Sequence, residues 1–173
     1  KFKKLNKLFG TVYITSQMYL SNWRQKDFGD FQKKFSKVFS SFEVKKLSKI
    51  DTKKENIKIG FLSPDFCKSH SISYFVKNLI KDLKQTKFKS YGLSLLRIEE
   101  HDQTTRNLKD LFDDWIDLGN KSDQDIVNII QNSNMDILVD LAGLWSSNRI
   151  SIFNTRICPL QITWLGFNNS SGL

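Results

Sequence analysis

The sequence predicts an α/β protein, in which a Rossmann-like parallel sheet follows a helical segment. Two observations carry this prediction. After Glu55, apolar runs rich in Ile, Leu and Val alternate with segments whose apolar residues recur every three or four positions. Up to about residue 45, the apolar residues have a helical spacing on either side of a turn. Alternating strands and helices are typical of a doubly wound parallel sheet with helices on both faces.

The first segment, residues 1–50, is predicted to be a helical connector that extends to about residue 45. Its apolar residues from Phe28 to Phe42 recur at steps of three and four, which places them on one face of a helix. An earlier helix is expected around Leu8–Leu20, with a turn at Ser21–Gly29. Two such helices bury little surface by themselves. We therefore expect them to pack against the next domain or against further helical pairs upstream.

The second segment, residues 56–173, is predicted to form one α/β domain. A helix is expected up to Leu83, a short one near Leu108 and a third starting at Ser122, whose side chain can cap it. The last two strands are so apolar that we expect both of their faces to be covered. The predicted strands, in order, are Ile57–Leu62, Phe88–Leu96, Trp115–Leu118, Met135–Leu141 and Leu160–Phe167.

Three loops follow predicted strands at the edge of the sheet where ligands bind. In doubly wound folds, ligands lie outside the carboxyl ends of the strands. This rule selects Ser63–Ser69, Ala142–Asn148 and Gly166–Gly172. Gly143 and Gly166 allow tight turns and a close approach of the backbone to a ligand. We therefore expect the ligand-binding and catalytic residues to lie in these three loops.

Composition excludes several classes of protein. A chain of 173 residues with 39% hydrophobic residues can bury a core. No apolar run reaches the roughly 20 residues of a membrane span, and the lysine-rich start resembles no signal peptide. The sequence therefore predicts a soluble cytoplasmic protein without a membrane partner, whose two cysteines are reduced. The net charge of +9 is interpreted as lysine-covered helix faces, so a nucleic-acid partner is not expected; a basic nucleic-acid binder is the alternative that charge alone favours.

The sequence lacks the common cofactor and metal motifs. There is no G-x-G-x-x-G, no P-loop, no H-E-x-x-H and no paired C-x-x-C. With two histidines and two cysteines in the chain, we expect no closed zinc site, and the missing fingerprint predicts no dinucleotide cofactor. Cys67 and His70 stand three residues apart, but nothing typical of a cysteine hydrolase accompanies them.

His70 is the candidate catalytic residue, because it lies at the end of the loop that leaves the first strand. An imidazole there can exchange a proton or hydrogen-bond a substrate hydroxyl, although a helix cap or surface role is an alternative. For Asp65, a structural role in the turn after Pro64 is favoured over catalysis. His101 lies in a polar stretch and is expected to be exposed.

Two charged residues near the second loop leave alternatives open. Asp140 ends an apolar strand, so its carboxylate must find partners or face the cleft. Arg149 either pairs with Asp140 or contacts a ligand.

Three stretches resemble the catalytic region of the O-N-acetylglucosamine transferase family, which includes the plant SPINDLY proteins and bacterial members with tetratricopeptide repeats. These stretches are IKIGFLSPDFCKSHSISYF, MDILVDLAGLWSSNRISIF and PLQITWLGFNNSSGL. They stand in the family's order and separation, and the resemblance covers about residues 57–173. Residues 10–38 resemble the helices that join the repeat array to the catalytic lobe in bacterial members.

The resemblance implies an enzyme with two Rossmann-like lobes, the glycosyltransferase B arrangement, of which this chain is the first. Such an enzyme transfers N-acetylglucosamine from UDP-GlcNAc to Ser or Thr of an acceptor protein or peptide, with inversion and without a metal; SPINDLY relatives use the fucose donor. His70 matches the family's cleft histidine. The resemblance also maps the loops Gly143–Asn148 and Gly166–Gly172 onto the border of the cleft. The predicted substrate-binding residues are Asp65, Gly143, Leu144, Trp145, Asn148, Arg149, Gly166 and Asn168.

The sequence also departs from the family pattern. One extra residue separates Phe66 from His70, and Leu144 and Trp145 replace a polar pair after the loop glycine. The chain ends near the point where the family crosses to its second lobe, which holds most of the uridine diphosphate contacts. We therefore expect a fragment or a degenerate gene product, inactive alone. The alternative is a non-catalytic interaction scaffold derived from this family.

Overall fold

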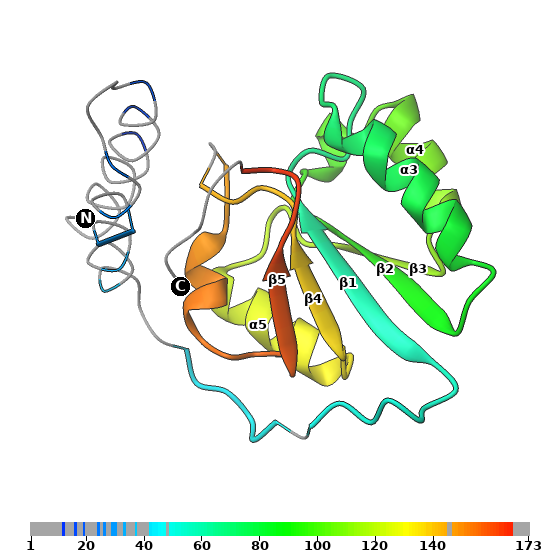
Figure 1. The fold of residues 1–173 in the computed structure, drawn as a ribbon. Coiled ribbons are helices and arrows are strands. Elements are labelled where there is room, and N and C mark those ends of the chain that lie inside the picture. Colours follow the sequence, from blue (N-terminus) through cyan, green and yellow to red (C-terminus); the bar gives the residue numbers. More distant parts are fainter. Residues whose placement is uncertain are drawn as a thin grey trace.

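The computed structural model describes residues 42–47, 49–144 and 147–167, together with scattered single positions before residue 38. Five parallel strands form one sheet in the order β3-β2-β1-β4-β5 (Figure 1). Along the chain the strands are β1 (Ile57–Ser63), β2 (Phe88–Ser94), β3 (Asp114–Asp117), β4 (Ile137–Asp140) and β5 (Leu160–Thr163). The predicted α/β fold with a Rossmann-like parallel sheet is confirmed.

Three α-helices connect the strands and cover both faces of the sheet (Figure 1). They are α3 (Ile72–Leu83), α4 (Gln103–Leu111) and α5 (Asp123–Asn132). Two short 3₁₀ helices, η1 (Ile98–Glu100) and η2 (Ile150–Asn154), were not predicted. The strand and helix order follows the expected alternation, and only the boundaries shift by a few residues.

The period of two along each strand sorts the core into two layers. On β1, Ile59 and Phe61 pack with α3 and α4, whereas Leu62 packs on the opposite side with α5. On β4, Val139 and Leu138 divide in the same way. Successive side chains of a strand point to opposite faces, so an uninterrupted apolar run fills both layers.

A buried carboxylate joins β1 to β4 at the amino end of the sheet. Asp136 is 4% exposed, and its side chain accepts the backbone N–H of Lys58 at 3.0 Å and the ammonium of Lys54 at 2.6 Å. The two strands then pair in parallel from Ile59 opposite Ile137. This contact fixes the register of the strands at which the chain reverses its direction of winding.

The last predicted strand is shorter and more exposed than expected. Strand β5 ends at Thr163 instead of Phe167, and Leu160 and Ile162 are 38% and 42% exposed. The prediction that both of its faces are covered is wrong. The physical reason is position, because among the described residues β5 pairs only with β4, at the edge of the sheet.

Residues 42–47 are extended instead of helical, so the helix predicted to about residue 45 is wrong over this stretch. The backbone N–H of Lys45 donates to Oε1 of Gln131 at 3.1 Å, and the Gln131 amide donates back to the Lys45 carbonyl at 3.4 Å. Phe42 packs against the core layer of α5. The rest of the predicted connector, apart from the scattered positions and residues 49–50, lies outside the described residues.

None of the helices in the described ranges is long and apolar enough to span a bilayer.

The core layer under α3 should carry much of the stability. Ile80 is fully buried, and its replacement in Ile80→Ala should lower the free energy of unfolding by about 2–5 kcal/mol, because the lost methyl groups leave a cavity. Lys81→Ala, at the neighbouring exposed position, should change it by less than about 0.5 kcal/mol. Urea unfolding of both variants measures the difference. Equal losses would show that α3 is not packed as described.

Candidate functional site

A polar side chain ends every strand at the carboxyl edge of the sheet. These residues are Ser63, Ser94, Asp117, Asp140 and Thr163, and adjacent ones lie in or next to paired register positions. Three of them accept the backbone N–H two residues further on, at 2.9 Å for Ser63, 3.3 Å for Ser94 and 3.1 Å for Asp140. A side-chain oxygen of this kind turns the chain sharply out of a strand.

The winding of the chain reverses between β1 and β4. From β1 the chain moves through β2 to β3, and then returns to β4 on the other side of β1. Ligands of doubly wound sheets bind at this switch point. The loops after β1 and β4 are the first two of the three loops selected from the sequence.

The β1–α3 loop is tied to the beginnings of both α3 and α4. Thr105 of α4 donates its hydroxyl to the carbonyl of Phe66 at 2.7 Å, and Asp102 accepts the backbone N–H of Lys68 at 2.7 Å. Ser73 of α3 donates its hydroxyl to the carbonyl of Cys67 at 2.9 Å. These contacts join three elements, so the loop is held in one conformation.

Asp65 and His70 face each other across this loop. Their closest atoms, Oδ2 of Asp65 and Nε2 of His70, are 3.8 Å apart. Nδ1 of His70 accepts a long hydrogen bond of 3.4 Å from the backbone N–H of Ile72, so the neutral ring carries its proton on Nε2, toward Asp65. The imidazole is 41% exposed and can reach a ligand. Burial raises the pKa of Asp65 above its ordinary value, and the charge of His70 opposes that rise.

The turn role predicted for Asp65 belongs to Ser63 instead. Oγ of Ser63 accepts the backbone N–H of Asp65, and the Asp65 carbonyl accepts the N–H of Cys67 at 2.8 Å. The Asp65 carboxylate is thereby left to face His70.

The loop after β4 is built on Asp140, which is 3% exposed. Its carboxylate accepts the backbone N–H of Ala142 at 3.1 Å, the N–H of Gly143 at 2.9 Å and the hydroxyl of Thr163 at 3.1 Å. Burial raises the pKa of Asp140 above its ordinary value, while these hydrogen bonds act in the opposite direction. Asp140 therefore finds partners within the fold, and it binds the ends of β4 and β5 together.

Two glycines are required where these loops meet. Gly143 has φ of +59°, a left-handed conformation that favours glycine, and a Cβ there would overlap Cβ of Phe167. A Cβ on Gly166 would overlap the carbonyl oxygen of Leu141. The backbones of the two loops therefore touch, as the glycines suggested from the sequence.

The other predicted site residues do not gather around one point. Leu144 is fully buried, and Oδ1 of Asn148 accepts the backbone N–H of Ile150 at 3.1 Å. Arg149 pairs with Asp123 at the start of α5 and not with Asp140, so the pairing considered from the sequence is wrong. Asp140 is already saturated by nearer donors. Trp145 and Asn168 lie outside the described residues.

Comparison with known families decides the relationship of this chain. The model of the family described as Glycosyl transferase family 41 matches residues 35–173. The chain belongs to this family.

Several relatives of this family 41 chain are plant proteins. It is 31% identical over 121 residues to the SPINDLY protein of Arabidopsis thaliana. That protein is named "Probable UDP-N-acetylglucosamine--peptide N-acetylglucosaminyltransferase". The alignment covers 68% of this chain and 13% of that protein. The SPINDLY protein of Hordeum vulgare, which bears the same name, is 28% identical over 83% of this chain and 15% of its own length. The family 41 chain thus spans about a seventh of these relatives.

A solved structure confirms the fold. The chain superimposes with a TM-score of 0.84 on a Thermobaculum terrenum O-GlcNAc transferase mutant, K341M, at 20% identity. The match covers 96% of this chain and 32% of that one. The arrangement of β1–β5 therefore corresponds to about a third of that solved chain.

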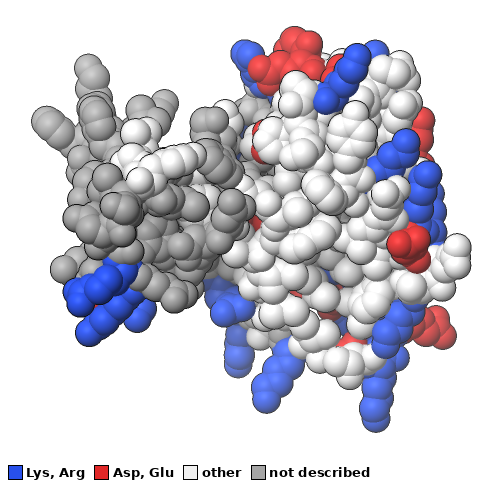
Figure 2. Space-filling view, turned by 45° about the horizontal axis from the view of Figure 1, so that its top comes forward, with Lys and Arg blue, Asp and Glu red and all other residues white. Residues whose placement is uncertain are grey.

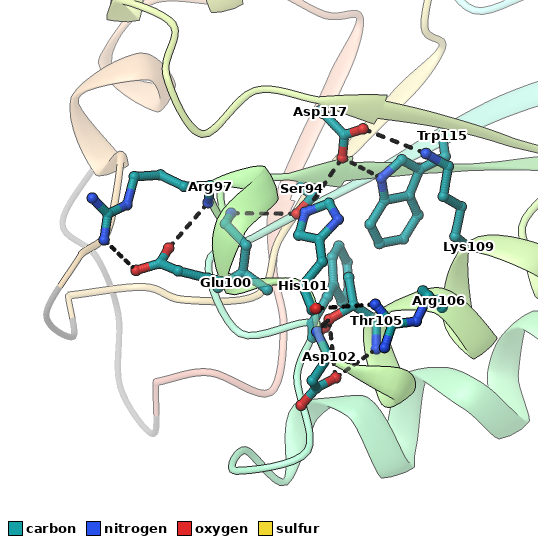
Figure 3. A network of polar contacts seen from close by, with 12 residues as sticks. Ser94, Arg97, Glu100, His101, Asp102, Thr105, Arg106, Lys109, Trp115 and Asp117 are labelled. Carbon is teal, nitrogen blue, oxygen red and sulfur yellow. Dashed lines mark hydrogen bonds and ion pairs between the residues drawn. The ribbon is translucent and has the colours of Figure 1, made fainter.

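The second histidine of the family 41 chain is packed inside the fold. His101 has a side chain only 12% exposed, with Nε2 3.6 Å from Oδ1 of Asp117 (Figure 3), so the prediction of an exposed residue is wrong. Asp117 also accepts the indole N–H of Trp115 at 2.6 Å. The short turn η1 brings His101 back over the end of β3, which the polar sequence did not indicate.

The surface charge and the two cysteines give no further indication of a ligand or metal at the candidate site. On the face shown in Figure 2, lysines and arginines project around the rim and most of the centre is uncharged. Cys67 and Cys158 are both free thiols, and burial raises the pKa of Cys158 to about 12. Within the described ranges, no group of three His, Cys, Asp or Glu residues is placed to hold a metal ion.

The strand-end polar residues were not singled out from the sequence, apart from Asp140. The signal was available, because Ser63 and Thr163 each end or interrupt an apolar run. Their role became visible only when the parallel registers placed them on one edge.

Gly143→Ala should destabilise the chain strongly. The substitution forces an L-residue into a left-handed conformation and against Phe167, and we expect a loss of about 2 kcal/mol or more in the free energy of unfolding. Gly29→Ala is the matched control, because a Cβ there meets no atom of the described residues within 4 Å. Urea unfolding compares the two. A loss no greater than that of the control would contradict the loop contact.

Asp65→Asn should raise stability at neutral pH. Burial raises the pKa of Asp65, so protonated Asp65 favours the folded state. This contribution to the free energy of unfolding is complete below the pKa of an unfolded Asp, about 3.9, and is lost as pH rises through the folded pKa. Asn is neutral at every pH, so the variant does not bury a charge at pH 7. Urea midpoints should therefore be higher in the variant at pH 7 and converge with the parent toward pH 4. Asp82→Asn, at an exposed position of α3, serves as the control; a lower midpoint for Asp65→Asn at pH 7 would refute this account.

Proposed function

We propose that this chain is the first catalytic lobe of a protein O-glycosyltransferase. The complete enzyme transfers N-acetylglucosamine from UDP-GlcNAc to Ser or Thr of an acceptor protein, with inversion at the sugar. The family match over residues 35–173 is the observation that carries the proposal. The names of the SPINDLY relatives and the pairing of Asp65 with His70 at the switch point support it.

In this proposal His70 acts on the acceptor hydroxyl. As that hydroxyl attacks the anomeric carbon and the uridine diphosphate leaves, its proton must pass to another group. The Ile72 N–H bond to Nδ1 is long, at 3.4 Å, so it is weak and exchanges readily for a substrate hydroxyl. Asp65, beside Nε2, stabilises the imidazolium that forms. The pair thus resembles a base with an orienting carboxylate.

The two glycine loops shape the donor side of the cleft. Gly143 and Gly166 bring the backbones of the loops after β4 and β5 into contact. We propose that the second lobe supplies most of the uridine diphosphate contacts, so the isolated chain does not transfer sugar. The proposed chemistry needs no metal, and the protein acts in the cytoplasm.

The test is a transfer assay on the complete protein that contains this chain. Labelled UDP-GlcNAc and the corresponding fucose donor are offered with acceptor peptides. His70→Ala should lower kcat by about 10²–10⁴-fold with a smaller effect on the KM for the donor, because the general base is lost. Lys121→Ala, an exposed position on the same edge of the sheet, is the control and should keep full activity.

The alternative is a non-catalytic scaffold. Buried Leu144, at the position where the family has a polar residue, is the observation that favours it. A complete protein that transfers neither sugar, or one in which His70→Ala transfers as fast as the parent, would overturn the enzyme proposal.

A further inference from the structure

A groove lies between α3 and α4, beside the candidate site. It encloses about 130 Å³, and Leu108 and Leu111 of α4 line it with apolar side chains. Tyr74 of α3, a residue that is 69% exposed, and Asn107 of α4 also line it. Figure 1 shows the two helices side by side at the upper right. A lining that mixes apolar and polar side chains suits an extended peptide.

The charged side chains that line the groove are all positive. Lys68, from the β1–α3 loop, and Lys77, from α3, both line it. The described residues that line the groove include no carboxylate. Helix α3 also begins at the Lys68 end, without an acidic residue in its first turn, so its positive dipole end lies there. The groove therefore complements a negatively charged segment.

Asp102 does not line the groove, but it caps α4 beside Lys68 with a carboxylate that stays negatively charged. It accepts the backbone N–H of Lys68 at 2.7 Å and that of Thr105 at 2.9 Å. These hydrogen bonds, that of Lys68 first, hold the pKa of Asp102 below its ordinary value. The same contacts fix the Lys68 end of the groove, so little ordering is required when a ligand binds.

The groove is continuous with the candidate site through one short loop. Lys68 stands two residues before His70, and Ser73 both lines the groove and donates to the carbonyl of Asp65 at 3.1 Å. A polypeptide that presents a hydroxyl to His70 can therefore continue into the groove. This continuity selects the acceptor chain as the occupant.

We propose that the α3–α4 groove binds an acidic segment of the acceptor polypeptide, and so selects acceptors with carboxylates near the modified residue. Identifying the occupant as the acceptor rests on the proposed function. Lys77 lies five residues into α3 from Ile72, about 7.5 Å along the helix axis. An extended peptide advances about 3.3 Å per residue. Two peptide residues that are two or three positions apart therefore span the axial distance from the start of α3 to Lys77.

The first experiment measures binding without turnover, on the complete protein. The probes are a fluorescein-labelled peptide with the repeat Glu-Leu-Ser and the same peptide with Gln in place of each Glu. By fluorescence anisotropy, the Glu peptide should bind at least about fivefold more tightly, and Lys77→Glu should abolish the difference. Lys53→Glu is the matched control: it makes the same change in net charge at an exposed position before β1 and should leave the difference intact.

Three results would overturn the groove proposal. The first is equal binding of the two peptides by the parent protein, or no binding of either. The second is an equal loss in Lys77→Glu and Lys53→Glu, which would mean attraction by net charge alone. The third is displacement of the Glu peptide by an equal concentration of a thymidine oligonucleotide, which would mark a general anion surface.

A second experiment separates this proposal from the proposed function. With labelled donor, Lys77→Glu should raise KM for the Glu peptide at least about fivefold and leave kcat and the KM for the Gln peptide unchanged. Transfer without this change in KM refutes the groove and keeps the enzyme. Lys77-dependent binding of the Glu peptide by a protein that transfers no sugar refutes the acceptor assignment and the enzyme proposal together.

Discussion

The carboxylate of Asp140 is buried at the end of β4 and accepts three hydrogen bonds, from the loop after β4 and from the last residue of β5. Two of them come from the backbone N–H groups of Ala142 and Gly143, and the third comes from the hydroxyl of Thr163 on β5. A buried carboxylate without partners would be costly, so the loops must keep the positions that satisfy it. The ends of both strands are set by this one group.

The other loops at the carboxyl edge of the sheet are held in a similar way. The turn held by Asp140 puts Gly143 in a left-handed conformation and brings Gly166 against Leu141. On the other side of the switch point, Ser63 makes a similar turn and leaves Asp65 to face His70. The site is therefore assembled from strand-end oxygens that turn the chain, and its reactive groups are those that the turns do not use.

The sequence predicted the fold because β1 and β4, at the centre of the sheet, carry apolar residues that fill both core layers. It failed where position in the sheet mattered. The residues Leu160 and Ile162 look like a covered strand, but they lie at an edge. Phe42 continues the helical spacing of the phenylalanines before it, yet it belongs to an extended segment held by α5 and Thr155.

The candidate site was predicted only in part, for a similar reason. Motif and loop position led to His70, Gly143 and Gly166, and the structure places these residues in the loops expected, because that placement depends on local chain geometry. Their roles in catalysis and binding stay predictions. The partners of Asp140 and Arg149 depend on which strands and helices become neighbours, and that is not visible in one sequence. The ion pair of Arg149 with Asp123 and the groove between α3 and α4 could therefore not be predicted, because both depend on which elements pack together.

Amide hydrogen exchange in Asp140→Asn tests the central claim most directly. In the parent chain, the amides of Ala142 and Gly143 should exchange slowly, because the buried carboxylate accepts both. In the variant, one carboxylate oxygen becomes an amide NH₂, so at least one of these two amides should exchange about tenfold faster or more, equivalent to roughly 1.4 kcal/mol. The amide of Leu141, which donates to Leu62 at 3.0 Å, should remain protected and shows that the sheet is intact. If both loop amides stay as slow as in the parent, Asp140 does not hold these loops, and the account of the site is contradicted.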